Sequence, residues 1–175
     1  IGAGTGARCG GFMGNEMSTK GGIGSACVDL GDGLLVAALV AVNAVGDIID
    51  EQGQIMAGLR SPEGGFADTL EVMKKMARVT IDGDSNTVIG AIATNAKLSK
   101  AHTKKVAQMT QDGIARAVRP AHTMFDGDTI FALATGEIPA EVSVIGAYAA
   151  EVMAQAIRNA LRAATSLDGV RAMNE

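Results

Sequence analysis

The chain has 175 residues, a length that suits one domain with a sizeable hydrophobic core. It is 47% hydrophobic and 19% charged, a composition that excludes an intrinsically disordered tail. Its formal net charge of −4 argues against nucleic acid as a partner, because binding to phosphates requires a basic face.

The first third of the chain carries strand patterns separated by turn signals. Residues 23–30 and 34–43 flank a Gly-Asp-Gly turn at residues 31–33, which predicts a hairpin. Residues 47–55 are compatible with a second hairpin. Residues 59–65 contain a proline and paired glycines and predict a loop.

The middle of the chain alternates between helix and strand patterns. Residues 66–77 have apolar side chains at the spacing of one helix face, and residues 87–93 form an apolar run behind a polar turn. This run, like residues 34–42, is apolar on both faces, so we expect both faces of these strands to be covered. Ser99 is a suitable N-cap for a helix over residues 100–118.

The last third predicts a strand and a long helix. Residues 129–135 form a short apolar strand, and Pro139 is expected in the first turn of the helix that follows. Apolar residues between positions 145 and 161 make one face of that helix. Amphipathic helices and strands that are apolar on two faces together predict an α/β fold, built as a layered sandwich.

Neither a membrane span nor a disulfide framework is predicted. The longest apolar run, residues 34–42, is far shorter than the roughly 20 residues that cross a bilayer. Cys9 and Cys27 are the only cysteines, so a reducing, cytoplasmic setting is the default expectation. The glycine-rich start at Ile1 resembles the middle of a domain, so we expect a fragment or processed part of a longer protein.

Two ligand-binding motifs fail on their context. Residues 2–7 fit the loose form G-x-G-x-x-A of a dinucleotide loop, but no strand precedes them. Residues 82–86 open like a calcium loop, but Thr87 and Ala93 replace the required glycine and glutamate. The sequence therefore predicts neither a cofactor nor a metal ion.

The two histidines do not indicate a catalytic triad. His102 and His122 have no acid and nucleophile at a recognisable spacing, so we interpret both as surface or loop residues.

Thr87, directly after Asn86, offers chemistry that needs no histidine. A self-cleaved chain would begin at Thr87, and its free α-amino group could activate the residue's own hydroxyl. The alternative is that Thr87 is an ordinary strand residue.

Five segments occur in a characteristic order, at residues 2–7, 20–25, 42–47, 86–96 and 126–129. Together they resemble the DmpA-type aminopeptidase family, which includes the β-aminopeptidases and the nylon-oligomer hydrolases. The resemblance covers essentially the whole chain, which corresponds to about the second half of the longer family members.

This resemblance implies an αββα sandwich and a precursor that cuts itself before a serine or threonine. In this sequence the cut falls between Asn86 and Thr87. Within the single domain 1–175, residues 1–86 would end the α fragment and residues 87–175 would form the β fragment. Thr87 would then cleave external amides through an acyl-enzyme. The implied substrates are small peptides, β-peptides or 6-aminohexanoate oligomers.

The resemblance also implies roles for four further residues. Asn43 would donate to the oxyanion, where loss of one donor typically costs about 2.7–4 kcal/mol of barrier. Lys20 would lower the basicity of the Thr87 amine or hydroxyl. Asp126 and Asp128 would couple, one orienting that amine and the other supporting it or holding a substrate ammonium. The structural alternatives are a strand-ending asparagine, a surface lysine and an Asp-Gly turn.

The paired aspartates favour the nylon-oligomer branch, because the β-aminopeptidases carry serine and glutamate at these positions. The threonine at the cut favours the same branch. The family's oxyanion tyrosine lies upstream of this chain, and Tyr148 in the last predicted helix does not match it.

Two other functions stay open. An enzyme like ornithine acetyltransferase would use a similar threonine cut to transfer an acyl group to an amine. A self-associating domain without catalysis is suggested by the alanine-rich last helix. The family resemblance further implies a homo-oligomer, such as a tetramer, and association with the chain's own upstream segment.

Overall fold

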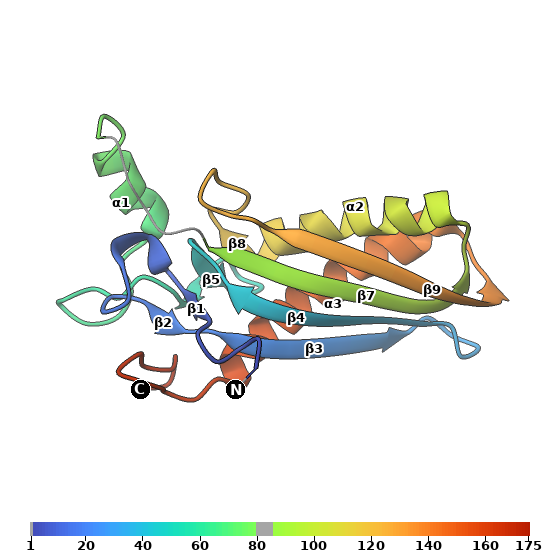
Figure 1. Cartoon of the computed structure of the whole chain (residues 1–175), viewed down its shortest axis with the longest axis horizontal. Helices are drawn as coiled ribbons and strands as arrows, with labels where there is room; N and C mark the ends of the chain where they lie inside the picture. The colour runs from blue at the N-terminus through green and yellow to red at the C-terminus, as the bar shows by residue number, and fades with distance from the viewer. Residues whose placement is uncertain (1, 80–85) are drawn as a thin grey trace.

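The computed structural model describes residues 2–79 and 86–175. A four-stranded sheet runs along the length of the molecule (Figure 1). Its strands, in spatial order, are β3 (Gly22–Asp29), β4 (Leu35–Asn43), β7 (Thr87–Lys97) and β9 (Thr129–Pro139). The strand β4 is antiparallel to both β3 and β7, whereas β9 joins β7 in parallel.

Two long helices cover one face of this sheet (Figure 1). α2 (Lys100–Ala117) and α3 (Val142–Ala163) pack against each other, with α3 over β3 and β4 and α2 along β9. Ile92, Ile114 and Met153 are fully buried between the sheet and these helices. No helix in the described part of the chain combines the length and the apolar character of a membrane span.

The helix α3 approaches β3 closely because the facing residues are small. A Cβ built on Gly24 would lie 2.1 Å from the carbonyl oxygen of Ala156 and 2.4 Å from the amide nitrogen of Ala160. Both atoms belong to the helix backbone, so any side chain at position 24 would push α3 away from the sheet.

Shorter elements gather around the end of the sheet where β4 ends and β7 begins (Figure 1). They are β1 (Arg8–Cys9), η1 (Gly11–Met13), β2 (Thr19–Lys20), β5 (Asp47–Ile49), β6 (Ile55–Ala57), α1 (Thr69–Lys75) and β8 (Val118–Arg119). The strands β1 and β2 pair with each other, and β5 pairs with both β6 and β8.

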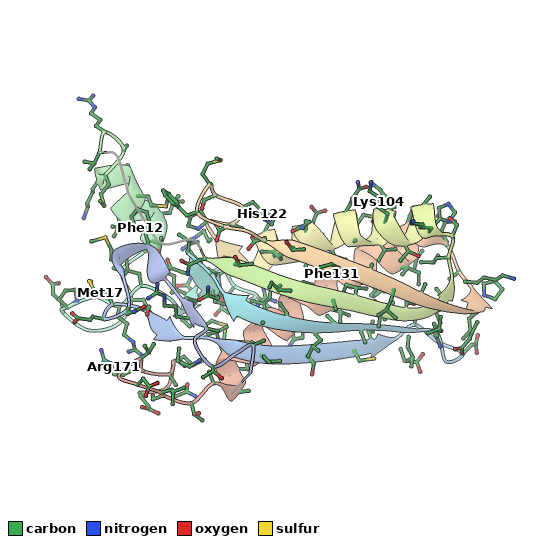
Figure 2. The ribbon with its side chains drawn as sticks, viewed as in Figure 1. Phe12, Met17, Lys104, His122, Phe131 and Arg171 are labelled. Atoms are coloured by element: carbon green, nitrogen blue, oxygen red, sulfur yellow. The ribbon has the colours of Figure 1, made fainter. Side chains whose placement is uncertain are left out.

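The second face of the four-stranded sheet is open in the described part of the chain. Large apolar side chains on this face are 40–63% exposed, and they are Ile23, Leu35, Leu39, Ile89, Phe131 and Leu133. Figure 2 marks Phe131 on β9. Within the described residues, therefore, only the face that packs against α2 and α3 is covered. Alanine occupies both faces of β4 and β7, so the sequence hides an alternation that the burial pattern shows clearly.

Most predicted elements are confirmed. The hairpin joins β3 to β4, and Ser99 caps α2 by accepting a 3.2 Å hydrogen bond from the amide of His102. The helix predicted over residues 66–77 is shorter, because Asp68 caps it at the amide of Leu70. Residues 80–85, including most of the calcium-like turn, lie outside the described residues.

The prediction for Pro139 is wrong. Pro139 ends β9, and the side chain of Glu141 caps α3 instead, accepting from the amide of Ser143 at 3.3 Å. Pro139 is the last residue of β9, a strand at the edge of the sheet, and proline within sheets is largely confined to edge strands.

Substitution of Gly24 by alanine is expected to lower the free energy of unfolding of the complete protein by about 1–3 kcal/mol, because the new methyl group overlaps the backbone of α3. Thermal or urea denaturation measures this change. Gly6→Ala is the matched control, since a Cβ there has no heavy atom within 4 Å. Equal stability of the two variants would contradict the close contact of β3 and α3.

Candidate active site

Thr87 and Asn43 face each other at one end of the sheet. Thr87 begins β7 and Asn43 ends β4, and the two residues are direct partners in the antiparallel pairing of these strands. Both line a cavity of about 520 Å³ on the open face of the sheet. The larger apolar side chains that line this cavity are Ile23, Leu39, Ile89 and Phe131.

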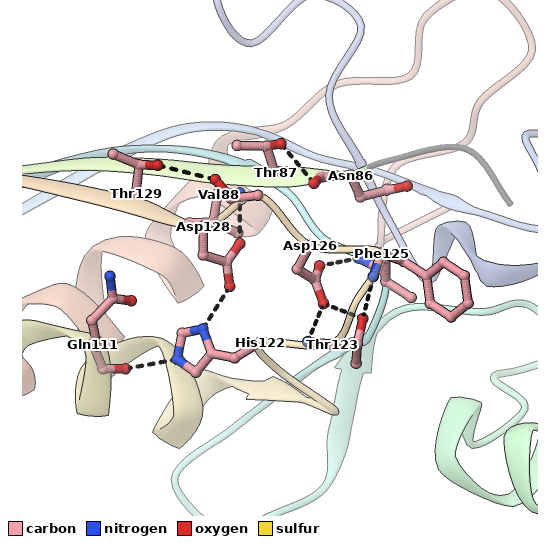
Figure 3. Close-up of polar contacts among 12 residues, drawn as sticks. Asn86, Thr87, Val88, Gln111, His122, Thr123, Phe125, Asp126, Asp128 and Thr129 are labelled. Atoms are coloured by element: carbon pink, nitrogen blue, oxygen red, sulfur yellow. Dashed lines mark hydrogen bonds and ion pairs between the residues drawn. The ribbon is translucent and has the colours of Figure 1, made fainter.

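The backbone of Asn86, directly before Thr87, takes part in three hydrogen bonds, and Figure 3 draws the one from the Thr87 hydroxyl. The Thr87 hydroxyl donates to the carbonyl oxygen of Asn86 at 2.6 Å. The amide of Gly127 donates to the same oxygen at 2.9 Å, and the amide of Asn86 donates to the carbonyl oxygen of Phe125 at 2.8 Å. The carbonyl is therefore polarised by a main-chain donor while a hydroxyl lies beside it.

Position 127 requires glycine for its small size. A Cβ built there would lie 2.9 Å from Oγ1 of Thr87, closer than real Cβ contacts allow. The Asp-Gly-Asp segment thus brings a backbone amide to the Asn86 carbonyl without displacing the threonine hydroxyl.

The side chain of Asn86 is buried beside the N-terminal part of the chain. Asn86 is 1% exposed, and its Nδ2 has no hydrogen-bond partner among the residues that the structure describes. A Cβ on Gly11 would lie 2.7 Å from this nitrogen, so glycine at position 11 leaves the space that the Asn86 side chain fills.

The Asp128 carboxylate lies next to the start of β7 (Figure 3). Its Oδ1 accepts from the amide of Val88 at 2.9 Å, and its Oδ2 lies 3.0 Å from Nδ1 of His122. Burial raises the pKa of Asp128, and the neighbouring Asp126 acts in the same direction, whereas the Val88 amide and His122 lower the pKa. The two predicted aspartates therefore lie close enough to interact electrostatically.

Asp126 has a different environment from Asp128. Its Oδ2 accepts from the amide and the hydroxyl of Thr123, at 3.0 Å and 2.7 Å, and its Oδ1 accepts from the amide of Val45 at 3.4 Å. These bonds hold the loop before β9 in shape and join it to the segment after β4. Asp126 thus supports the site through the loop backbone.

Sequence reasoning missed the contact of His122 with Asp128. His122 does lie in a loop, as expected, and its Nε2 is 3.3 Å from the carbonyl oxygen of Gln111 on α2. The six-residue separation of His122 and Asp128 matches no catalytic pattern. Only the turn of the loop brings the two side chains together (Figure 3).

Lys20 is buried and is not a surface lysine. It is 6% exposed, and its ammonium group donates to the carbonyl oxygens of Gly4, Ala7 and Gly21 at 2.8, 3.0 and 2.7 Å. Burial lowers the pKa of Lys20. Lys20 is not among the residues that line the cavity with Thr87.

One peptide unit connects Lys20 to Asn43. Lys20 binds the carbonyl oxygen of Ala7, and the amide of the following residue, Arg8, donates to Oδ1 of Asn43 at 3.2 Å. Because Oδ1 is engaged as an acceptor, Nδ2 of Asn43 remains a donor beside the cavity. Lys20 therefore supports the orientation of Asn43 through the backbone.

Two further observations concern residues outside this cluster. Tyr148 lies on α3, is 44% exposed and is not part of the cavity lining. Within residues 2–79 and 86–175, no group of three or more His, Cys, Asp or Glu side chains is arranged to hold a metal ion.

The comparisons with known proteins show the family of the chain. A model of Peptidase family S58 matches residues 1–174. The chain belongs to this family. S58 is the DmpA family, so the resemblance seen in the sequence is confirmed.

Named relatives include aminopeptidases and nylon-oligomer hydrolases. The chain is 38% identical to an uncharacterized aminopeptidase of Mycobacterium leprae, over 97% of this chain and 50% of the relative. It is 32% identical to a 6-aminohexanoate-oligomer endohydrolase of Kocuria sp., over 81% of this chain and 44% of the relative.

A solved structure shows the same fold. The β-aminopeptidase of Burkholderia sp. matches with a TM-score of 0.60 and 27% identity, over 90% of this chain and 44% of that chain. The S58 chain spans about half the length of the curated relatives it matches. The α/β class is thus confirmed, and the sheet with α2 and α3 is one sheet-and-helix pair of the layered sandwich.

Asp126→Ala is expected to lower the free energy of unfolding by about 1–3 kcal/mol, because the donors on Thr123 and Val45 lose their acceptor. Chemical denaturation of the complete protein measures the change. Asp112→Ala, at an exposed position of α2, is the control and should change stability little. A loss confined to activity would instead indicate direct contact of Asp126 with the reacting groups.

Proposed function

We propose that this S58 chain is the self-processing part of an N-terminal-threonine amide hydrolase, with Thr87 as nucleophile. The observation that carries the proposal is the pair of contacts on the Asn86 carbonyl oxygen. The Thr87 hydroxyl and the Gly127 amide lie 2.6 Å and 2.9 Å from that oxygen. Membership in a peptidase family supports the reaction class.

Self-cleavage would proceed as an acyl shift from nitrogen to oxygen. The Thr87 Oγ bonds to the Asn86 carbonyl carbon, and the developing oxyanion accepts from the Gly127 amide. The peptide C–N bond then breaks, and the Thr87 nitrogen takes the proton that the hydroxyl gave up and becomes a free amine. Water hydrolyses the resulting ester to a carboxylate on Asn86 and the Thr87 hydroxyl.

The freed Thr87 would then act on external amides. Its amine removes the proton from its own hydroxyl, and the Oγ attacks a substrate carbonyl to form an acyl-enzyme. Nδ2 of Asn43, oriented by the Arg8 amide, would donate to the oxyanion. Asp128, whose Oδ1 lies at the adjacent Val88 amide, would receive the Thr87 amine. Water then releases the acid product.

The cavity chemistry favours substrates with an apolar acyl chain. Thr87 and Asn43 are polar groups of the lining, and large aliphatic and aromatic side chains make much of the rest. A linear methylene chain, as in 6-aminohexanoate oligomers, fits such a surface, and one relative is named for hydrolysis of these oligomers. Small peptides and β-peptides form the second substrate group of the proposal.

The proposal includes the organisation of the protein. Residues 1–86 and 87–175 would remain together as two fragments of one domain, joined to the chain's own upstream segment in a homo-oligomer. A cytoplasmic setting is consistent with Cys9 and Cys27, which are both free thiols.

Intact-mass measurement of the complete protein tests the cut. The wild type should yield a fragment that begins at Thr87, whereas Thr87→Ala should stay as one chain and lose amide hydrolysis by at least about 10³-fold, because the hydroxyl nucleophile is gone. Thr87→Ser keeps a hydroxyl and should still cut. Thr135→Ala, at an exposed position of β9, is the control and should behave as the wild type. An uncut wild type with full activity would exclude this mechanism.

Gly127→Ala should slow self-cleavage by about 10²-fold or more, because the added methyl group displaces either the Thr87 hydroxyl or the donating amide. The rate is measured by intact mass after cell-free synthesis of the complete protein. Gly22→Ala is the matched control. Its Cβ would come no closer than 3.4 Å to any atom, an ordinary van der Waals distance, and Gly22 does not line the active-site cavity. Cleavage of Gly127→Ala at the wild-type rate would contradict the assigned donor.

Product analysis separates hydrolysis from acyl transfer. With an added amine acceptor, a hydrolase releases mainly the free acid. Conversion of most of the acyl group to a new amide would instead identify a transferase like ornithine acetyltransferase.

A further inference from the structure

His122 occupies a position that its packing alone does not explain. Its side chain is 39% exposed, whereas the Asp128 side chain that it contacts is 4% exposed. His122 also has a φ of +56°, in the left-handed region that non-glycine residues seldom adopt. Such conformations persist where surrounding contacts favour them, and they cluster at functional sites.

The ring of His122 is fixed at both nitrogens (Figure 3). Nδ1 lies 3.0 Å from Oδ2 of Asp128, and Nε2 lies 3.3 Å from the carbonyl oxygen of Gln111. A carboxylate oxygen accepts, so Nδ1 carries the proton in this pair. The other carboxylate oxygen, Oδ1, is thereby turned to the start of β7, where it accepts from Val88.

We propose that His122 is a positioning residue for Asp128, which it orients toward the amine that the cut frees on Thr87. The inference rests on the proposed function, because that amine exists only after self-cleavage. His122 does not touch the reacting atoms. It acts by donating to Oδ2, which favours the ionised form of the carboxylate and keeps Oδ1 directed at β7.

The charges around Asp128 support this role. From its own loop, Asp126 opposes the ionisation of Asp128, and His122 favours it. From β7, the Val88 amide favours ionisation. From α2, the Gln111 carbonyl oxygen faces His122, and the neighbouring Asp112 is exposed to solvent. Because burial raises the pKa of Asp128, loss of His122 would raise it further.

The first test titrates Asp128 in the uncut protein, so that it does not depend on hydrolysis. In the complete protein carrying Thr87→Ala, carboxyl-carbon NMR follows the ionisation of Asp128. Adding His122→Ala should raise the midpoint by roughly one pH unit or more, because the donor to Oδ2 is removed. Adding His102→Ala, at an exposed position of α2, should leave the midpoint unchanged. An unchanged midpoint in His122→Ala overturns the inference.

The second test uses the cut enzyme and the conservative variant His122→Asn. Asparagine tolerates the left-handed backbone, and its amide nitrogen can take the place of Nδ1. We expect His122→Ala to lower kcat/KM about 10–100-fold, as losses of orienting partners typically do, and His122→Asn to recover much of that loss. An activity of His122→Asn as low as that of His122→Ala, or a loss of stability without any loss of kcat/KM, overturns the inference.

These outcomes separate the two proposals. A wild type that neither cuts nor hydrolyses amides refutes the proposed function. If the wild type does both but the Asp128 midpoint is the same with and without His122→Ala, the positioning role alone is refuted. If His122→Ala does not fold, the His122→Asn midpoint decides, and it should lie above the wild-type value but by less than one pH unit, because a neutral donor remains.

Discussion

The backbone bridge between Asn86 and the loop before β9 is the constraint on which the site depends. Asn86 donates to the carbonyl oxygen of Phe125 and accepts from the amide of Gly127, as an extension of the parallel pairing between β7 and β9. The pairing that builds the sheet thus also holds the Asn86-Thr87 peptide, the proposed site of self-cleavage. This coupling gives the carbonyl a fixed donor at no further cost in chain ordering, because the strands are already aligned.

The directions of the strands bring their polar residues to one end of the sheet. The strand β4 ends where the antiparallel β7 begins, so Asn43 and Thr87 become neighbours. The parallel strand β9 begins at the same end, so Asp128 arrives on the other side of β7. Three segments far apart in sequence therefore meet at Thr87 without any long side chain reaching across the molecule.

Charge in the site is arranged through hydrogen bonds to the backbone. Lys20 is buried against three carbonyl oxygens and acts on Asn43 only through the peptide between Ala7 and Arg8. The Asp126 carboxylate accepts from Thr123 within the loop, whereas the Asp128 carboxylate lies at the start of β7. In a region of low dielectric, such fixed dipoles and donors need little reorganisation during a reaction.

Local signals in the sequence determined much of the fold and predicted the residues that meet at the candidate site. The hairpin before Leu35, the Ser99 cap and the Asn86-Thr87 pair are readable because turns, caps and the family's motifs involve residues close together in the chain. Tertiary structure alone decided the burial of Lys20, the contact of His122 with Asp128 and the end of β9 at Pro139. It also decided which sheet face stays open, since alanine and glycine fit either side of a strand. These features depend on segments that meet only after the chain has folded, and no local pattern encodes such contacts.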